Sequence, residues 1–120
     1  MKVSDIMISP VVVTQPGVKI SSLKKMLSRK QINAVPVIGE SESISGIIST
    51  SNIISCQDED TSVDKLTTDF VHVVMPTNRV KDATRIMAKH NVHHLIVMED
   101  GKVVGMLSSM DIIKVYAESE

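Results

Sequence analysis

Apolar residues along this chain follow a helical spacing in two places. Within residues 20–27 and again within 80–87, apolar side chains recur at intervals of three and four residues. That spacing places one apolar stripe on one face of a helix, while Lys24 and Arg85 fall largely outside it. The pattern predicts two amphipathic helices, and we expect the second to end near Asn91.

Short β-branched and aliphatic runs surround these helices and favour strands. The runs form two matching sets of three, which are 11–14, 35–38 and 44–49, then 70–74, 95–98 and 103–108. Pro16-Gly17 and Pro76 interrupt the chain before each helix, and Asp100-Gly101 between apolar runs is a strong hairpin signal. Helical turns are expected at 3–7 and 63–67, and closing helices near Asn52 and Asp111.

The two sets are copies of one repeat. Val3 and Val63 stand 60 residues apart, as do the other matched positions up to Val37 and Val97 (63 − 3 and 97 − 37). Beyond the hairpin turn, Gly46 matches Gly105 at an offset of 59 (105 − 46), so one residue is missing from the second turn. A tandem repeat of this length constrains the fold more than any local motif does.

The repeat predicts an α/β (α+β) fold in which each copy has a βαββα order after its first helical turn. Two such copies, each with a small sheet and one open apolar face, are expected to pack face to face about a pseudo-twofold axis. We assign residues 1–56 to the first repeat, 57–62 to an acidic linker and 63–120 to the second repeat.

Composition removes several classes of function. A net charge of −1 gives no electrostatic case for DNA or an anionic membrane, and aromatics make up only 2% of the chain, which weakens a single-strand nucleic-acid reading. No apolar run approaches the length of a membrane span, and the start of the chain does not resemble a signal peptide. The single cysteine, Cys56, favours a reducing compartment, so a cytoplasmic location is expected.

The repeat brings a polar signature into register twice, as Ser49-x-x-Asn52 and Ser108-x-x-Asp111. Each copy stands where a strand ends and a helix begins. Serine, aspartate and asparagine are all favoured at helix N-termini, so local sequence alone favours helix capping. The other interpretation is a ligand contact, because a carboxylate can accept from two neighbouring ribose hydroxyls and a helix N-terminus attracts phosphate.

The ordered set of motifs resembles the CBS domain, named for cystathionine β-synthase, in the tandem form called a Bateman module. The resemblance covers nearly the whole chain and rests on residues 3–7, on 32–37 with 92–97, and on 46–52 with 105–111. Two positions depart from it, since Ile96 stands opposite Pro36 and Asn52 stands opposite Asp111.

The resemblance implies adenosine-type ligands held in two clefts between the repeats, and it reverses the preference for simple capping. The stronger site would use Thr14, Ile32, Asn33, Ala34, His93, His94, Ser108 and Asp111. The weaker site would use Val74, Val92, His93, Ala34, Ser49 and Asn52. We expect the Asn52 site to be weaker because a neutral amide offers one acceptor oxygen instead of two carboxylate oxygens.

The histidines 90, 93 and 94 form a His-x-x-His-His run. On one continuous helix two of them would share a face, but the helix is expected to end near Asn91 and nothing nearby completes a ligand set. We therefore predict no metal site. The resemblance favours a phosphate contact from His93 or His94, which would strengthen on protonation of the imidazole.

No catalytic constellation or Walker-type loop is present, so we predict no enzymatic activity. The first hypothesis is a regulatory module that binds AMP, ADP, ATP or S-adenosylmethionine, requires no cofactor, forms a homodimer and signals to an unidentified protein partner. The second is a docking or dimerisation scaffold without a ligand. A nucleic-acid-associated regulator is a third reading, which the near-neutral charge disfavours.

Overall fold

A computed structural model describes residues 1–119, and it divides into two compact units. Unit 2 is the continuous segment Val12–Val71, whereas unit 1 combines Met1–Val11 with the chain from His72 onward. Each unit has its own small sheet and its own apolar core. The mixed α+β class with two copies of one repeat, expected from the sequence, is confirmed.

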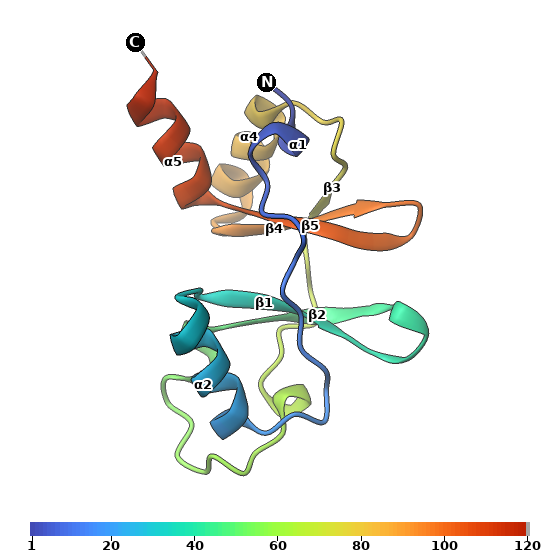
Figure 1. Ribbon diagram of the computed structural model, residues 1–120, viewed down its shortest axis with the longest axis vertical. Coiled ribbons are helices and arrows are strands. Elements are labelled where there is room, and N and C mark those ends of the chain that lie inside the picture. Colours follow the sequence, from blue (N-terminus) through green and yellow to red (C-terminus); the bar gives the residue numbers. More distant parts are fainter. Residues whose placement is uncertain (120) are drawn as a thin grey trace. The chain divides into compact units, whose positions relative to one another are not determined.

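Unit 2 is built on an antiparallel hairpin. Strand β1 (Ala34–Ile38) pairs with β2 (Ile44–Ser49), and the turn between them contains the short helix η1 (Glu40–Glu42). Helix α2 (Ile20–Lys30) lies against this hairpin and buries Ile20, Leu23 and Leu27, which are the stripe that the spacing predicted (Figure 1). The unit is completed by α3 (Thr50–Ile53) and η2 (Val63–Lys65).

Unit 1 repeats this plan with one additional strand. Strand β3 (Val73–Val74) pairs in parallel with β4 (His94–Glu99), and β4 pairs antiparallel with β5 (Lys102–Ser108). Helix α4 (Val80–His90) is capped by Asn91, whose positive φ of 54° closes the helix close to where the sequence placed its end. Helix α1 (Val3–Ile6) and helix α5 (Ser109–Glu118) complete the unit.

The first strand of each repeat is much shorter than its β-branched run. Of residues 11–14 only Thr14 pairs, through a single bridge to Val37, and of residues 70–74 only Val73 and Val74 form a strand. The prediction of full strands here is wrong. Pro10 and Pro16 lie close on either side of the first run, and proline cannot donate to a ladder, so little continuous pairing is available.

The segment that starts each sequence repeat packs in the unit that holds the other repeat's hairpin. In unit 1, the Val3 N–H donates to the Asn78 carbonyl at 2.8 Å, and Val80 N–H donates to Met1 O at 3.1 Å. In unit 2, the equivalent bonds run from Val63 N–H to Val18 O at 2.7 Å and from Ile20 N–H to Thr61 O at 2.9 Å. Val3 and Val63 are both fully buried in these cores.

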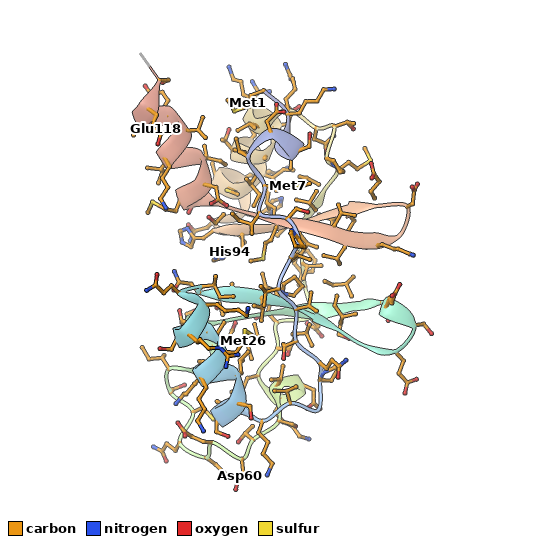
Figure 2. The ribbon with its side chains drawn as sticks, viewed as in Figure 1. Met1, Met7, Met26, Asp60, His94 and Glu118 are labelled. Atoms are coloured by element: carbon orange, nitrogen blue, oxygen red, sulfur yellow. The ribbon has the colours of Figure 1, made fainter. Side chains whose placement is uncertain are left out.

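A glycine in each hairpin allows this docking. A Cβ on Gly46 would lie 2.3 Å from the Thr68 carbonyl oxygen, and one on Gly105 would lie 2.8 Å from the Met7 sulfur. Figure 2 shows Met7 over the sheet of unit 1. The docked segments then bond to the strands, since Ile8 pairs with Met106 and Thr68 pairs with Ile47.

Candidate functional site

In unit 1, four of the residues predicted for the stronger site lie at one corner of the sheet. His94 opens β4 and is the cross-strand partner of Ser108, which closes β5. The N–H of Ser109, the first residue of α5, donates to the His93 carbonyl at 2.8 Å. The unit therefore brings together His93, His94, Ser108 and Asp111, and Figure 2 marks His94 at this corner.

Ser108 and Asp111 form a reciprocal capping box at the start of α5. The Ser108 N–H donates to Asp111 Oδ2 at 2.8 Å, and the Asp111 N–H donates to Ser108 Oγ at 3.2 Å. Capping by these residues, the interpretation favoured by local sequence, is confirmed. Among the described residues, no hydrogen bond reaches the other carboxylate oxygen, Oδ1, so it can still accept from a ligand hydroxyl.

The first repeat has a similar cap, but its amide oxygen already accepts two hydrogen bonds. Asn52 Oδ1 accepts from the Ser49 N–H at 2.8 Å and from the Ser49 hydroxyl at 2.9 Å. Asn52 Nδ2 donates to Thr68 Oγ1 at 3.1 Å. Both lone pairs of the Asn52 amide oxygen are therefore occupied, so a ligand hydroxyl can donate to it only if one of these bonds breaks, whereas Nδ2 keeps a second N–H.

His94 is half-buried, and its surroundings lower its pKa. The largest cause is burial, which disfavours the charged imidazolium, and the neighbouring His93 adds repulsion. The Asp111 carboxylate opposes both by favouring the charged form. The imidazole is therefore held mostly neutral at neutral pH, next to the carboxylate of the capping box.

In unit 2, residues 32–34 connect α2 to β1 and lie beside the cap of α3. Asn33 is exposed, and its carbonyl accepts from the Thr50 N–H at 2.9 Å, as His93 does from Ser109 in unit 1. Ile32 is partly buried against the core of unit 2, and Ala34 is buried at the start of β1.

Thr14, Val74 and Val92 have clear structural roles. The Thr14 N–H donates to Pro36 O at 3.0 Å and its carbonyl accepts from Ile38 N–H at 2.9 Å, so both backbone groups are already paired. Val74 is buried in the core of unit 1, and Val92 packs against the same core. Their predicted ligand contacts remain predictions.

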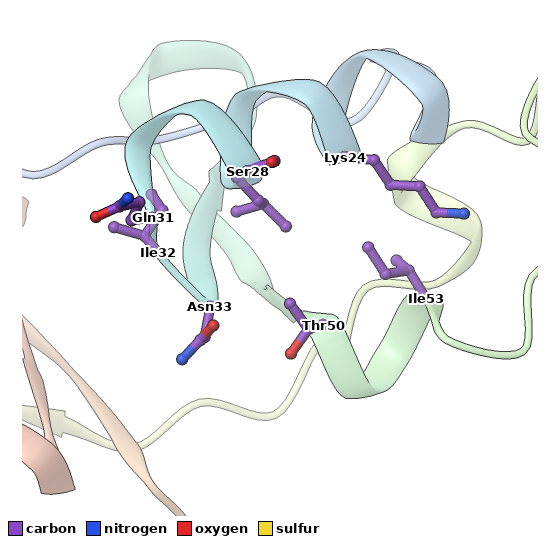
Figure 3. Close-up of a pocket in the computed structure, with 8 residues that line it drawn as sticks. Lys24, Ser28, Gln31, Ile32, Asn33, Thr50 and Ile53 are labelled. Atoms are coloured by element: carbon purple, nitrogen blue, oxygen red, sulfur yellow. The ribbon is translucent and has the colours of Figure 1, made fainter.

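A pocket of about 400 Å³ lies within unit 2, between α2 and α3 (Figure 3). Ser28 and Lys24 of α2 face Thr50 and Ile53 of α3 across it. We call this the α2–α3 groove, and its lining residues are Lys24, Leu27, Ser28, Gln31, Ile32, Asn33, Thr50 and Ile53. Of these lining residues, only Ile32 and Asn33 were predicted from the sequence as ligand contacts. The apolar pattern does not show that the helix after Ser49 stops after four residues, so the groove itself could not be predicted.

Two features of residues 1–119 bear on other functions. Across residues 1–119, His, Cys, Asp and Glu side chains do not gather in threes as a metal ion would need. The described helices also lack one that is long and apolar enough to cross a bilayer.

Comparison with known proteins gives matches along nearly the whole chain. The sequence model of the CBS domain matches residues 3–59 and again residues 62–118. An uncharacterized protein of Methanocaldococcus jannaschii, MJ1232, is 29% identical over 119 residues, and these cover 98% of this chain. The chain spans 40% of the length of that relative.

Two solved structures share the fold at low sequence identity. The CBS domain pair of protein MJ0100, crystallised with 5′-methylthioadenosine and S-adenosyl-L-methionine, has a TM-score of 0.92 at 24% identity, with 100% of this chain and 98% of that chain covered. CBSX2 in complex with AMP has a TM-score of 0.83 at 22% identity, with 98% and 96% covered.

Proposed function

Because this chain belongs to the CBS domain family and carries two CBS domains in tandem, we propose that it is a regulatory module that binds an adenosine-containing ligand. CBS domain pairs typically serve regulation or signal transduction. The MJ0100 pair holds 5′-methylthioadenosine and S-adenosyl-L-methionine, and CBSX2 holds AMP. These complexes support the class of ligand, which for this chain comprises AMP, ADP, ATP and S-adenosylmethionine.

The observation that carries the proposal is the free oxygen of Asp111. Ribose presents two adjacent hydroxyls, and a carboxylate with an open Oδ1 accepts from them while Oδ2 holds the cap of α5. The Ser108 hydroxyl can donate to a phosphate or another anionic group near the start of this ten-residue helix, where the helix dipole favours negative charge. His93 and His94 add donors at the same corner.

In this proposal, the stronger site keeps the residues that the family resemblance implies, which are the Asp111 corner, residues 32–34 and Thr14, and residues 32–34 supply apolar walls for the base. The weaker site joins Ser49 and Asn52 to Val74, Val92 and His93, with Ala34. The bond from Asn52 to Thr68 supports the unequal ranking, because a ligand at Asn52 must compete with it.

Regulation requires that the ligand bind two conformations of the module with different affinity. We propose that the module works as a homodimer, that the ligand shifts its conformational equilibrium, and that a partner protein reads the shift.

Calorimetric titration with AMP, ATP and S-adenosylmethionine tests the proposal. Asp111→Asn keeps the cap, as Asn52 does in the first repeat, but removes the charge. Hydrogen bonds to charged groups contribute about 1.5–3 kcal/mol, so the tighter binding step should weaken about tenfold or more. Asn52→Ala serves as the matched variant and should leave that step unchanged.

If the Asn52 variant loses the tighter step and the Asp111 variant does not, the ranking of the sites is wrong. If no adenosine compound binds the wild-type chain, the sensor proposal fails and the docking scaffold takes its place. Salt-dependent binding to duplex DNA would favour the third reading.

A further inference from the structure

Helix α5 is only lightly packed against unit 1. Within the described chain none of its ten residues is buried, whereas α2 and α4 each bury two or more. Met110, Ile113 and Tyr116 are 52%, 54% and 81% exposed, and Ile112 is the residue of α5 that packs against the core of the unit. Helices shorter than about 12 residues are marginal in water without tertiary packing, so α5 depends strongly on its intrinsic propensity and on its cap.

The matching helix of unit 2 shows that the cap alone does not set the length of the helix. Ser49 and Asn52 form the same kind of capping box, and an isoleucine pair follows it as in α5. The helix nevertheless ends at Ile53, after four residues, and the next residue, Ile54, is 85% exposed. One kind of start therefore precedes a helix of four residues in unit 2 and of ten in unit 1. Small contributions after the first turn decide how far such a helix continues.

The Asp111 carboxylate connects the proposed ligand contact to this helix. Its Oδ2 accepts from the Ser108 N–H at 2.8 Å, and the Asp111 N–H donates to Ser108 Oγ at 3.2 Å. The bond from the Ser109 N–H to the His93 carbonyl ties the first turn to the start of β4. The other oxygen, Oδ1, has no hydrogen-bond partner within residues 1–119 and meets the ribose hydroxyls in the proposed function. Both oxygens belong to one planar group, so a ligand held at Oδ1 also fixes the orientation of Oδ2.

We propose that a ligand bound at Asp111 tightens the cap of α5 and increases the helical population of α5, so that this helix is the element that signals occupancy. This inference rests on the proposed function and names the element that carries its regulation. A ligand that has already fixed the Asp111 carboxylate leaves less conformational entropy for the cap to lose. Because linkage is reciprocal, stabilising α5 strengthens ligand binding by the factor by which the ligand stabilises α5.

Hydrogen exchange tests the effect of the ligand on the helix. The probe is AMP or S-adenosylmethionine, whichever binds the wild-type chain more tightly, at a concentration that saturates the tighter step of the titrations above. An N-cap changes the helix equilibrium about 2- to 30-fold, so the bound probe should slow exchange at residues 112–118 at least about twofold. Ser108→Ala removes an acceptor of the cap and should speed exchange at the same amides in the ligand-free chain.

Substitutions away from the carboxylate test the reciprocal effect. Lys114 and Ala117 are exposed on α5 and take no part in the proposed site. Glycine at both positions lowers the helix equilibrium constant about fivefold per site relative to alanine, which limits the loss of affinity to about thirtyfold. The variant with Lys114→Gly and Ala117→Gly should bind the probe at least about threefold more weakly than Lys114→Ala. Lys114→Ala is the matched control, because it removes the same charge and keeps the helix propensity.

Two results would overturn the proposal. One is equal affinity of the glycine variant and its alanine control, and the other is exchange in α5 that the bound probe leaves unchanged or makes faster. Wild-type exchange in α4, β4 and β5 verifies that the glycine variant keeps the fold of unit 1. If neither AMP nor S-adenosylmethionine binds the wild-type chain, the sensor proposal fails together with this inference, whereas binding without a response of α5 removes this inference alone.

Discussion

Protonation of His94 should weaken the fold at mildly acidic pH. Its pKa in the folded chain lies below the ordinary value near 6.5, chiefly because of burial, so the unfolded chain takes up the proton more readily. The His94 contribution to stability is therefore complete above that ordinary pKa and is lost as pH falls through it toward the folded pKa. Urea unfolding at pH 7.5 and at pH 5.5 should show a smaller pH dependence for His94→Gln than for wild type. An equal or larger pH dependence in the variant would contradict the assignment.

At the scale of single residues, the sequence predicted the two polar strand–helix junctions, at Ser49–Asn52 and at Ser108–Asp111, but only part of their hydrogen bonding. The spacing of Ser108 and Asp111 already indicated a cap, because a capping box depends on residues three apart. The bond from Asn52 to Thr68 spans 16 residues and depends on where the docked segment after η2 lies. No local pattern contains that information, so the extent to which the Asn52 amide is occupied became clear only from the fold.

At the scale of elements, the two hairpin glycines should differ in their tolerance of a methyl group. Gly46→Ala would drive its Cβ against the Thr68 backbone, whereas Gly105→Ala would first meet the end of the flexible Met7 side chain. Overpacking typically costs about 1–3 kcal/mol, and we expect Gly46→Ala near or above the upper end and Gly105→Ala near the lower end. Chemical denaturation of both variants measures the difference. A larger loss for Gly105→Ala would refute the docking argument.

Helices α2 and α4 could be predicted from spacing, and so could the turn at Asp100-Gly101, because these signals are local. The strands expected at 11–14 and 70–74 were overestimated, since β-branched residues favour strand conformation but do not show how many pairing partners are available. The closing helices α3 and α5 also differ in length, and the reason lies outside the repeated sequence. Both carry paired isoleucines, but the chain after Ile54 leads into the acidic linker, where Glu59 and Asp60 pair with Lys24 and Lys19.

At the scale of the whole molecule, the compact units do not coincide with the predicted repeats 1–56 and 63–120. Deleting residues 1–8 should therefore damage unit 1 although most of that unit lies in the second half of the chain. The deletion removes the buried Val3, whose burial alone is worth about 1.5–3 kcal/mol, together with its bond to Asn78. Hydrogen exchange should become faster in α4, β4 and β5 and stay unchanged in β1 and β2, whose core contains none of the deleted residues.

A chain lacking only its last two residues is the control for that deletion and should exchange like wild type. Faster exchange spread evenly over both hairpins would mean that the two cores are not separately stabilised.

The contribution of residues 1–11 to unit 1 also has a consequence for synthesis on the ribosome. Unit 2 is a continuous stretch of 12–71, so every residue of its core has been translated when Val71 is added. Residues 1–11 are made before unit 2, but their partners Asn78 and Met106 are made after it. Residues 1–11 must therefore wait while unit 2 forms, and Ile6 and Met7 stay available to chaperones until the hairpin of β4 and β5 is translated.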